Sequence, residues 1–254
     1  MERVERPTGQ RNNIKTDDQP MKPANSTTNL RAASPDSLPT APPSAKIPLS
    51  AKLILSSFML IWFPVYWHNY GPTNFLYFCD AALLLTLAGI WRESALLISM
   101  SAVGILVPQF IWLLDFGGNC LGWHLTGMTN YMFNPKIPLF ARCLSGFHGW
   151  LPLLLVWLLR RVGYDRRALA AWSTLGVGLV LVSYGFLPGP GTHPEDPNIP
   201  VNVDYVYGLS DTIPQHWMNQ NLYVAVWAAA LVVLVYLPTH AVLRRLYHPA
   251  RPAA

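Results

Sequence analysis

Residues 95–115 read ALLISMSAVGILVPQFIWLLD, a run of twenty uncharged residues that ends at Asp115. A helix needs about 20 apolar residues to cross the hydrocarbon core of a bilayer, because each residue adds about 1.5 Å. A second run at 221–243, NLYVAVWAAALVVLVYLPTHAVL, is equally long and carries no charged residue. Both segments are therefore predicted to be transmembrane helices.

Four further apolar runs lie around these two, at 49–68, 74–91, 139–159 and 168–187. Of the 254 residues, 52% are hydrophobic and 12% are charged, and that charged fraction is about half of what a soluble domain carries. Only helices satisfy their own backbone groups in lipid at this segment length, since barrel strands are shorter and alternate in polarity. The sequence predicts an all-α, polytopic membrane bundle of six transmembrane helices over 46–247.

The two ends of the chain differ from this bundle in composition. Residues 1–45 are rich in Pro, Ser, Thr and Asn and contain no apolar run of the kind a signal peptide needs. Such a segment cannot bury enough apolar surface to offset its ordering entropy, so we expect a disordered tail. Residues 248–254 are expected to form a short C-terminal tail.

The distribution of Lys and Arg predicts the orientation of the helices. In a six-helix arrangement ten of them fall on one side: Lys46, Lys52, Arg92, Arg160, Arg161, Arg166, Arg167, Arg244, Arg245 and Arg251. The other side has only Lys136 and Arg142. Cytoplasmic loops carry the excess of basic residues, so both tails are predicted to be cytoplasmic. The net charge of +5 then reflects topology, and we expect no nucleic acid partner.

Asp80 and His148 are the ionisable residues that stand out within the predicted spans. An ionisable group inside a membrane costs about 2.5–3.5 kcal/mol on insertion scales, so each needs an explanation. Asp80 is expected roughly 9 Å below the outer end of its helix and His148 roughly 13 Å below. An Asp–His pair at matched depth can orient a general base. A structural hydrogen bond between helices and a proton pathway remain open as alternatives.

Two nucleophile candidates lie near this pair. Cys79 precedes Asp80 directly, and Ser145 lies three residues before His148, on the same face of a helix. A buried Cys is more often a small apolar filler than a nucleophile. The predicted catalytic residues are therefore Asp80, His148, Cys79 and Ser145.

The predicted outer connections supply candidate substrate-binding residues. Asp115 and Arg142 border the 116–138 connection, where we expect them to form an ion pair. The longest connection, 188–220, holds Asn202, Asp204 and Tyr207 in a polar and aromatic stretch. That stretch is interpreted either as a lid that contacts lipid headgroups or as an aromatic belt at the interface.

Metals, cofactors and disulfides receive little support from the sequence. The outer histidines, His68, His124, His193 and His216, lack the i,i+3 or i,i+4 spacing of ligands on one helix. There is no CxxC motif and no phosphate-binding glycine loop, so we expect no metal and no cofactor. Cys120 and Cys143 fall on the oxidising side of this topology, where they are candidates for a disulfide.

The segments NYGPTNFLYFCDAALLLTLAGIWRESALL, GMTNYMF, IPLFARCLSGFHGWLPLLLVWL and GYDRRAL carry a resemblance. Over most of residues 65–245 the chain resembles uncharacterised bacterial multipass membrane proteins. More remotely it is similar to YwaF-like membrane proteins and to the androgen-induced-gene type of membrane lipid hydrolase. That likeness implies a bacterial inner membrane location, an early-helix site at Cys79 or Asp80, and a later histidine at His148. The hydrolases have Thr at the early position, where this chain has Tyr77 and Phe78.

These observations favour an intramembrane hydrolase or acyltransferase that acts on lipid acyl esters, with membrane lipids as its partners. The alternatives are a transporter or proton-coupled permease, in which Asp80 and His148 line a path, and a structural subunit of a membrane complex. In the last case, the 188–220 connection would bind a protein partner.

Overall fold

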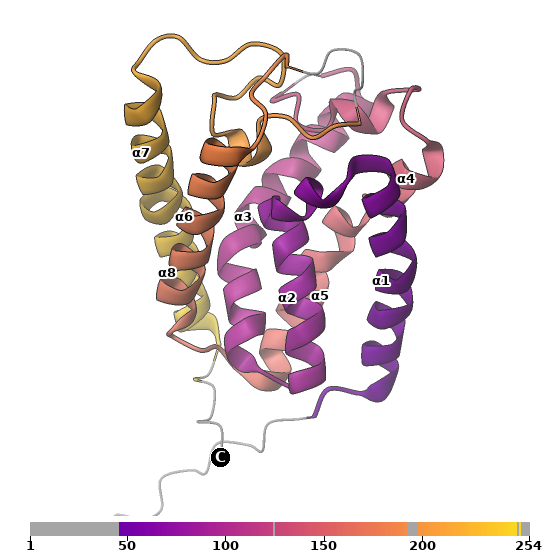
Figure 1. Ribbon diagram of the computed structural model, residues 1–254. Coiled ribbons are helices and arrows are strands. Elements are labelled where there is room, and N and C mark those ends of the chain that lie inside the picture. Colours follow the sequence, from indigo (N-terminus) through magenta and orange to yellow (C-terminus); the bar gives the residue numbers. More distant parts are fainter. Residues whose placement is uncertain (1–45, 124, 193–197, 248, 250–254) are drawn as a thin grey trace, which may run out of the picture. The chain divides into compact units, whose positions relative to one another are not determined.

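The computed structural model describes residues 46–123, 125–192, 198–247 and 249, which form a bundle of helices (Figure 1). The predicted N-terminal tail, 1–45, lies outside the described residues, and so does the predicted C-terminal tail except Pro249. Within the described ranges there is no β-strand, only an isolated bridge between Tyr164 and Pro249.

The elements follow one another with short connections at one end of the bundle and longer ones at the other. In chain order they are α1 (Leu49–Tyr70), the 3₁₀ turn η1 (Pro72–Leu76), α2 (Phe78–Arg92), α3 (Ala95–Cys120), η2 (Asn130–Phe133), α4 (Leu139–Leu144), α5 (Phe147–Val162), α6 (Ala168–Phe186), η3 (Val203–Tyr205), α7 (Gln220–Ala230), the π-helical turn η4 (Leu231–Tyr236) and α8 (Leu237–Leu246).

Five helical segments of the described chain are long and apolar enough to cross a membrane: Leu49–Tyr70, Ala95–Cys120, Leu139–Val162, Ala168–Phe186 and Gln220–Leu246. They coincide closely with five of the six predicted spans. The prediction of an all-helical multipass membrane protein is confirmed at this level.

The sixth predicted span, 74–91, is not one continuous helix. The 3₁₀ turn η1 ends at Leu76, Tyr77 is extended, and α2 then begins at Phe78 and has 15 residues. The cause is a contact from far along the chain, because the backbone N–H of Phe78 donates to Asp204 Oδ1 at 3.1 Å. This carboxyl group caps a helix that therefore starts later than the hydropathy predicts.

The predicted span 139–159 is also interrupted. Ser145 and Gly146 form a tight turn between α4 and α5, in which the N–H of Gly146 donates to the carbonyl of Cys143 at 3.0 Å. His148 consequently lies in the first turn of α5 rather than deep within a single helix. The turn brings Ser145 and His148 together at the end of the bundle where the long connections lie.

Helix α3 forms the centre of the bundle and packs against α2, α5, α6 and α8. Its packing against α6 is tight at Gly104, where a Cβ atom would lie 1.9 Å from the ring of Trp172. Only glycine leaves room for that indole, which is fully buried. This contact holds the middle of the bundle together through shape complementarity.

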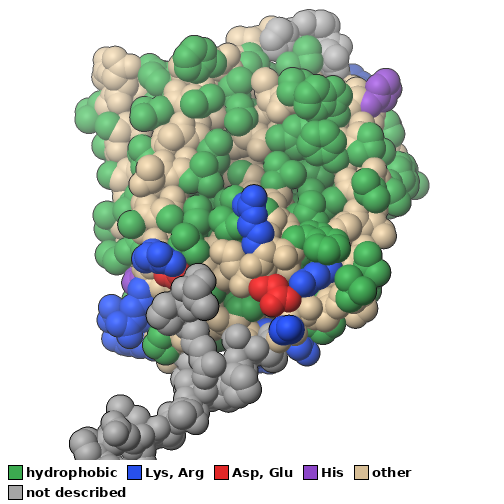
Figure 2. Space-filling model, turned by 60° about the horizontal axis from the view of Figure 1, so that its bottom comes forward, with side chains coloured by type: hydrophobic (Ala, Val, Ile, Leu, Met, Phe, Trp, Pro, Cys, Tyr) green, Lys and Arg blue, Asp and Glu red, His purple; other side chains and the backbone are tan. Residues whose placement is uncertain are grey.

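Nine Lys and Arg residues lie at the end of the bundle where α1 and α6 start and α2, α5 and α8 finish (Figure 1). We call it the basic end, and it contains Lys46, Lys52, Arg92, Arg160, Arg161, Arg166, Arg167, Arg244 and Arg245. Most of the Lys and Arg side chains visible in Figure 2 gather there, beside a largely apolar surface. The opposite end, with η1 and the connections 121–138 and 187–219, is called the loop end.

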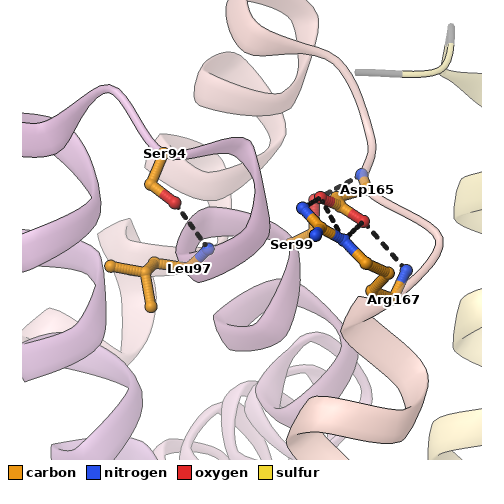
Figure 3. Close-up of polar contacts among 5 residues, drawn as sticks. All are labelled: Ser94, Leu97, Ser99, Asp165 and Arg167. Atoms are coloured by element: carbon orange, nitrogen blue, oxygen red, sulfur yellow. Dashed lines mark hydrogen bonds and ion pairs between the residues drawn. The ribbon is translucent and has the colours of Figure 1, made fainter. Parts of the chain in front are cut away.

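Short polar contacts fix the helices at the basic end (Figure 3). Ser94 caps α3 by accepting the N–H of Leu97 at 3.4 Å. The turn between α5 and α6 is attached to α3, because the N–H of Asp165 donates to Ser99 Oγ at 3.0 Å. Arg167 in turn holds the Asp165 carboxylate through Nε and Nη2, the latter at 2.7 Å.

Candidate functional site at the loop end

Two carboxyl groups meet at the start of α2. Asp80, which is 2% exposed, accepts a hydrogen bond of 2.5 Å from Asn74 Nδ2, and its Oδ1 faces Cys79 Sγ at 3.7 Å. Asp204 caps α2 through Oδ1, while its buried Oδ2 has no hydrogen-bond partner. Among the described residues no Lys or Arg forms an ion pair with either carboxyl group. Such an arrangement is costly in a bundle of this kind and indicates a functional site.

The loop that carries Asp204 has an unusual backbone. Asn202, Asp204 and Tyr205 have positive φ angles of 51°, 58° and 59°, which few residues other than glycine adopt. Helix α7 holds this conformation, because Trp227 Nε1 donates to the carbonyl of Asp204 at 2.9 Å. Burial raises the pKa of Asp204 well above its usual range, since the charged form loses its hydration.

Asn202 organises the rest of this loop. Its Oδ1 accepts the N–H of Tyr207 at 2.9 Å, and its Nδ2 donates to the carbonyls of Gly208 and Ser210. Tyr207 in turn donates its hydroxyl to the carbonyl of Tyr184 on α6. The structure thus brings the three predicted substrate-binding residues Asn202, Asp204 and Tyr207 into one loop. There, the side chains of Asn202 and Tyr207 form hydrogen bonds within the protein, which stabilise the loop and attach it to α6.

Ser145 and His148 are joined in a way that differs from a Ser–His dyad. His148 Nδ1 lies 2.7 Å from the backbone carbonyl of Ser145, and the Ser145 hydroxyl shares a hydrogen bond of 2.5 Å with Tyr66 Oη. A carbonyl only accepts, so Nδ1 carries the proton and Nε2 is left as an acceptor. The imidazole stacks on Trp112 at 4.7 Å between ring centroids, which fixes its orientation.

No hydrogen bond joins Asp80 to His148 within the described part of the chain. Asp80 bonds with Asn74 and Cys79, and His148 bonds with Ser145. The predicted orienting role of Asp80 toward the imidazole therefore has no hydrogen bond to support it. The catalytic roles of both residues stay predictions, and Cys79 is the candidate nucleophile that contacts a carboxyl group.

The predicted ion pair between Asp115 and Arg142 does not form. Asp115 is fully buried and accepts the N–H groups of Thr126, Gly127 and Thr129 at 2.6, 3.1 and 2.9 Å, together with the Thr129 hydroxyl. These nearby donors satisfy the carboxylate locally, so Asp115 anchors the 125–130 loop. Arg142 instead donates from Nη1 to the carbonyl of Met132 at 2.9 Å.

The remaining sequence candidates are dispersed. Cys120 and Cys143 are both exposed and are not joined by a disulfide. Of the outer histidines, His124 and His193 lie outside the described residues. The described ranges contain no group of three His, Cys, Asp or Glu residues suited to a metal ion.

An apolar groove between α1 and α2 lies next to this cluster. It has a volume of about 580 Å³ and is lined by Ser56, Met59, Leu60, Phe63, Pro64, Leu84 and Leu87. Leu84 lies one turn after Asp80 on α2, and Phe63 lies three residues before Tyr66 on α1, so one end of the groove adjoins the polar residues. Sequence analysis missed Tyr66, Asn74 and this groove. Tyr66 and Asn74 could have been found from the sequence, because each is a polar residue close to the outer end of a predicted span.

Comparison with known proteins adds no family to this description. No protein-family model matches the chain, and no curated protein and no solved structure matches it either. The resemblance to bacterial multipass proteins and lipid hydrolases thus depends on the sequence segments quoted above, and the function has to be argued from the site.

Proposed function

We propose that all six predicted segments span the membrane, with η1 and α2 together forming the sixth span. Helix α2 packs along α3, which is itself long enough to cross. In this topology the basic end faces the cytoplasm of a bacterial cell, with both termini on that side of the inner membrane, in keeping with the excess of Lys and Arg there. The loop end then lies at the outer leaflet.

Within this topology the protein is an enzyme that cleaves or transfers the acyl group of a membrane lipid ester. The observation that carries this proposal is the apolar α1–α2 groove, which adjoins two polar pairs, Cys79 with Asp80 and Tyr66 with Ser145. The groove is open on the side of α1, where Leu60 is 77% exposed. It therefore suits an acyl chain that enters from the bilayer, with its ester beside the polar groups.

Cys79 is the proposed nucleophile, because its thiol faces Asp80 Oδ1 while the Ser145 hydroxyl is engaged by Tyr66. Sγ attacks the ester carbonyl and its proton passes to the Asp80 carboxylate. Collapse of the tetrahedral intermediate breaks the C–O bond, the leaving alcohol takes that proton, and a thioester remains. Water then attacks the thioester with its proton passing to His148 Nε2, and that proton returns to Cys79. A second alcohol in place of water gives acyl transfer.

The test is ester turnover by the purified full chain in detergent, with a phospholipid carrying a fluorescent acyl group. Cys79→Ser and His148→Ala are expected to reduce kcat by about 100-fold or more. Cys143→Ser, an exposed cysteine elsewhere at the loop end, is the matched control and should retain wild-type turnover. Equal rates for wild type, Cys79→Ser and His148→Ala would refute the proposal.

A second candidate function is proton-coupled transport. It is favoured by the two buried carboxyl groups of Asp80 and Asp204, neither of which is paired with a described Lys or Arg. Ionisable groups of this kind mark proton pathways in membrane proteins. This function predicts pH-dependent flux in proteoliposomes that is abolished by Asp80→Asn and unaffected by Cys79→Ser. Flux that survives Asp80→Asn would exclude it.

A further inference from the structure

Arg142 has a hydrogen-bonding edge that no described residue uses. Its Nη1 donates to the carbonyl of Met132, whereas Nε is buried without a hydrogen-bond partner and Nη2 makes no bond to a described residue. The two ion pairs of the described chain, Lys52–Glu93 and Arg167–Asp165, do not involve it. A buried donor without a partner is costly, so this edge calls for an acceptor from outside the chain.

Arg167 shows what the same edge does when it has a partner. There Nε lies 3.1 and 3.2 Å from the two Asp165 carboxylate oxygens, and Nη2 lies 2.7 Å from Oδ2 (Figure 3). Nε and Nη2 form a planar fork that binds two oxygens of one anion, either a carboxylate or a phosphate. In Arg142 neither Nε nor Nη2 bonds to a described residue, and the third nitrogen, Nη1, is held by the carbonyl of Met132.

The surroundings of Arg142 indicate that the anion arrives from the membrane. Leu139 and Phe140 on the same short helix, α4, are 66% and 57% exposed. Apolar side chains in that position suit the boundary between headgroups and acyl chains. Helix α4 also packs against α1, and the phenol of Tyr70 on α1 lies within electrostatic range of the guanidinium.

The site continues from Arg142 toward the proposed ester-cleaving groups. Tyr70 packs edge-on against Tyr66 with ring centroids 5.1 Å apart, and the Tyr66 hydroxyl bonds to Ser145. Phe63, one turn below Tyr66, lines the α1–α2 groove. From Arg142 on α4, the hydroxyl groups of Tyr70 and Tyr66 and then the apolar groove thus follow one another along the neighbouring helix α1.

We propose that Arg142 binds the phosphate of a glycerophospholipid through Nε and Nη2. The ester of that lipid lies near Tyr66 and Cys79, and its acyl chain occupies the α1–α2 groove. The substrate class of the enzyme proposed above is then a glycerophospholipid rather than a neutral glyceride. The phosphate site depends on that function only for the position of the ester.

The test measures binding without turnover. The full chain in a neutral detergent is titrated with an ether-linked phosphatidylglycerol, which has no ester to cleave, and bound lipid is counted by native mass spectrometry. Arg142→Gln is expected to raise the Kd by about tenfold to hundredfold, as for the loss of charge-assisted hydrogen bonds. Lys136→Gln, which removes the other described Lys or Arg of the loop end, is the matched control and should change the Kd by less than about twofold.

Further probes identify the ligand chemistry. An ether-linked diglyceride, which lacks phosphate, should bind wild type and Arg142→Gln equally. Arg142→Lys keeps the charge but lacks the fork, so an intermediate Kd is expected. Equal Kd values for phosphatidylglycerol in wild type and Arg142→Gln would overturn the proposal. Displacement of the lipid by inorganic phosphate at the affinity of the lipid itself, or tighter binding of oleate, would overturn the assignment to a phospholipid.

The two proposals fail separately. Arg142-dependent binding of the ether lipid without any ester turnover would sustain the phosphate site and refute the enzyme. Turnover of a phosphatidylglycerol ester with the same kcat and KM in wild type and Arg142→Gln would sustain the enzyme and refute the phosphate site. An unchanged unfolding temperature without lipid shows that each variant is folded. If Arg142→Gln does not fold, Arg142→Lys is used in its place.

Discussion

At the basic end, the carboxylates of Glu93 and Asp165 each lie 2.7 Å from a cationic nitrogen. At the loop end, by contrast, the buried Asp80 and Asp204 have no ion pair with a described Lys or Arg, and Arg142 has none with a described carboxylate. The paired charges are the more exposed ones, and exposed pairs contribute little to stability. The two unpaired carboxyl groups, Asp80 and Asp204, are buried, which is expensive. This difference supports the proposal that the basic end determines orientation in the membrane and that the loop end holds the functional site.

The largest expected effect tests whether the loop end depends on buried polar contacts. Asp115→Ala leaves the buried N–H of Thr129 and the N–H groups of Thr126 and Gly127 without their acceptor. We expect the free energy of unfolding to fall by about 3 kcal/mol, because unsatisfied buried donors are costly. Chemical denaturation in mixed micelles measures it. Asp165→Ala at the basic end is the control. An equal loss in the free energy of unfolding there would show that the two ends do not differ in their dependence on polar contacts.

A second prediction uses the pH dependence of stability. Burial raises the pKa of Asp204 in the folded state, so the folded protein holds a proton that the unfolded chain has already released. Stability therefore falls as the pH rises from the ordinary carboxyl range toward the raised pKa. Asp204→Asn keeps the Oδ1 acceptor for the N–H of Phe78 and should flatten this dependence, with higher stability at neutral pH.

Thermal unfolding across a pH series checks this prediction. Asp165→Asn is the matched variant at the basic end, where Arg167 lowers the pKa of the carboxyl group. In the wild type, ionised Asp165 stabilises the fold at pH values above the usual carboxyl pKa, and this stabilisation is lost on acidification. The two variants should therefore change the dependence of stability on pH in opposite directions. Profiles that change in the same direction would contradict the assignment.

The smallest effect is expected for Lys52 and Glu93, which join α1 to the turn between α2 and α3 at 2.7 Å. Lys52 lowers the pKa of Glu93 by hydrogen bonding, so the pair contributes at neutral pH and is lost as the pH falls. Lys52→Met should cost no more than about 0.5 kcal/mol, because Glu93 lies at the surface, where solvent screens the attraction. Unfolding at low and high salt measures it, and a salt-independent loss would show that packing rather than charge is involved.

The spans were predictable because hydropathy responds to local composition. The segment predicted at 168–187 is the helix Ala168–Phe186, and the one predicted at 221–243 lies within Gln220–Leu246. The late start of α2 was not predictable, since its cause, Asp204, lies 126 residues from Phe78. Helix boundaries set by such distant contacts leave no local pattern in the sequence.

The site was predictable only in part, for a similar reason. The cost of burial singled out Asp80 and His148, and both are buried at the loop end. Their partners, Asn74 and the carbonyl of Ser145, come from a 3₁₀ turn and from a break between two helices. The Asp115–Arg142 pair was predicted from opposite charge alone. Backbone N–H groups within fifteen residues of Asp115 supplied its bonds instead.

The short helix α2 has a consequence for the surrounding bilayer. Fifteen residues cover about 22 Å along the helix axis, whereas the hydrocarbon region of a membrane is about 30 Å thick. In the proposed topology the 3₁₀ turn η1 completes this span, and the extended Tyr77 separates it from α2. Water and headgroups reach the first turn of α2 more readily across such a break than along a continuous apolar helix, and the hydrolysis proposed above needs water at that depth.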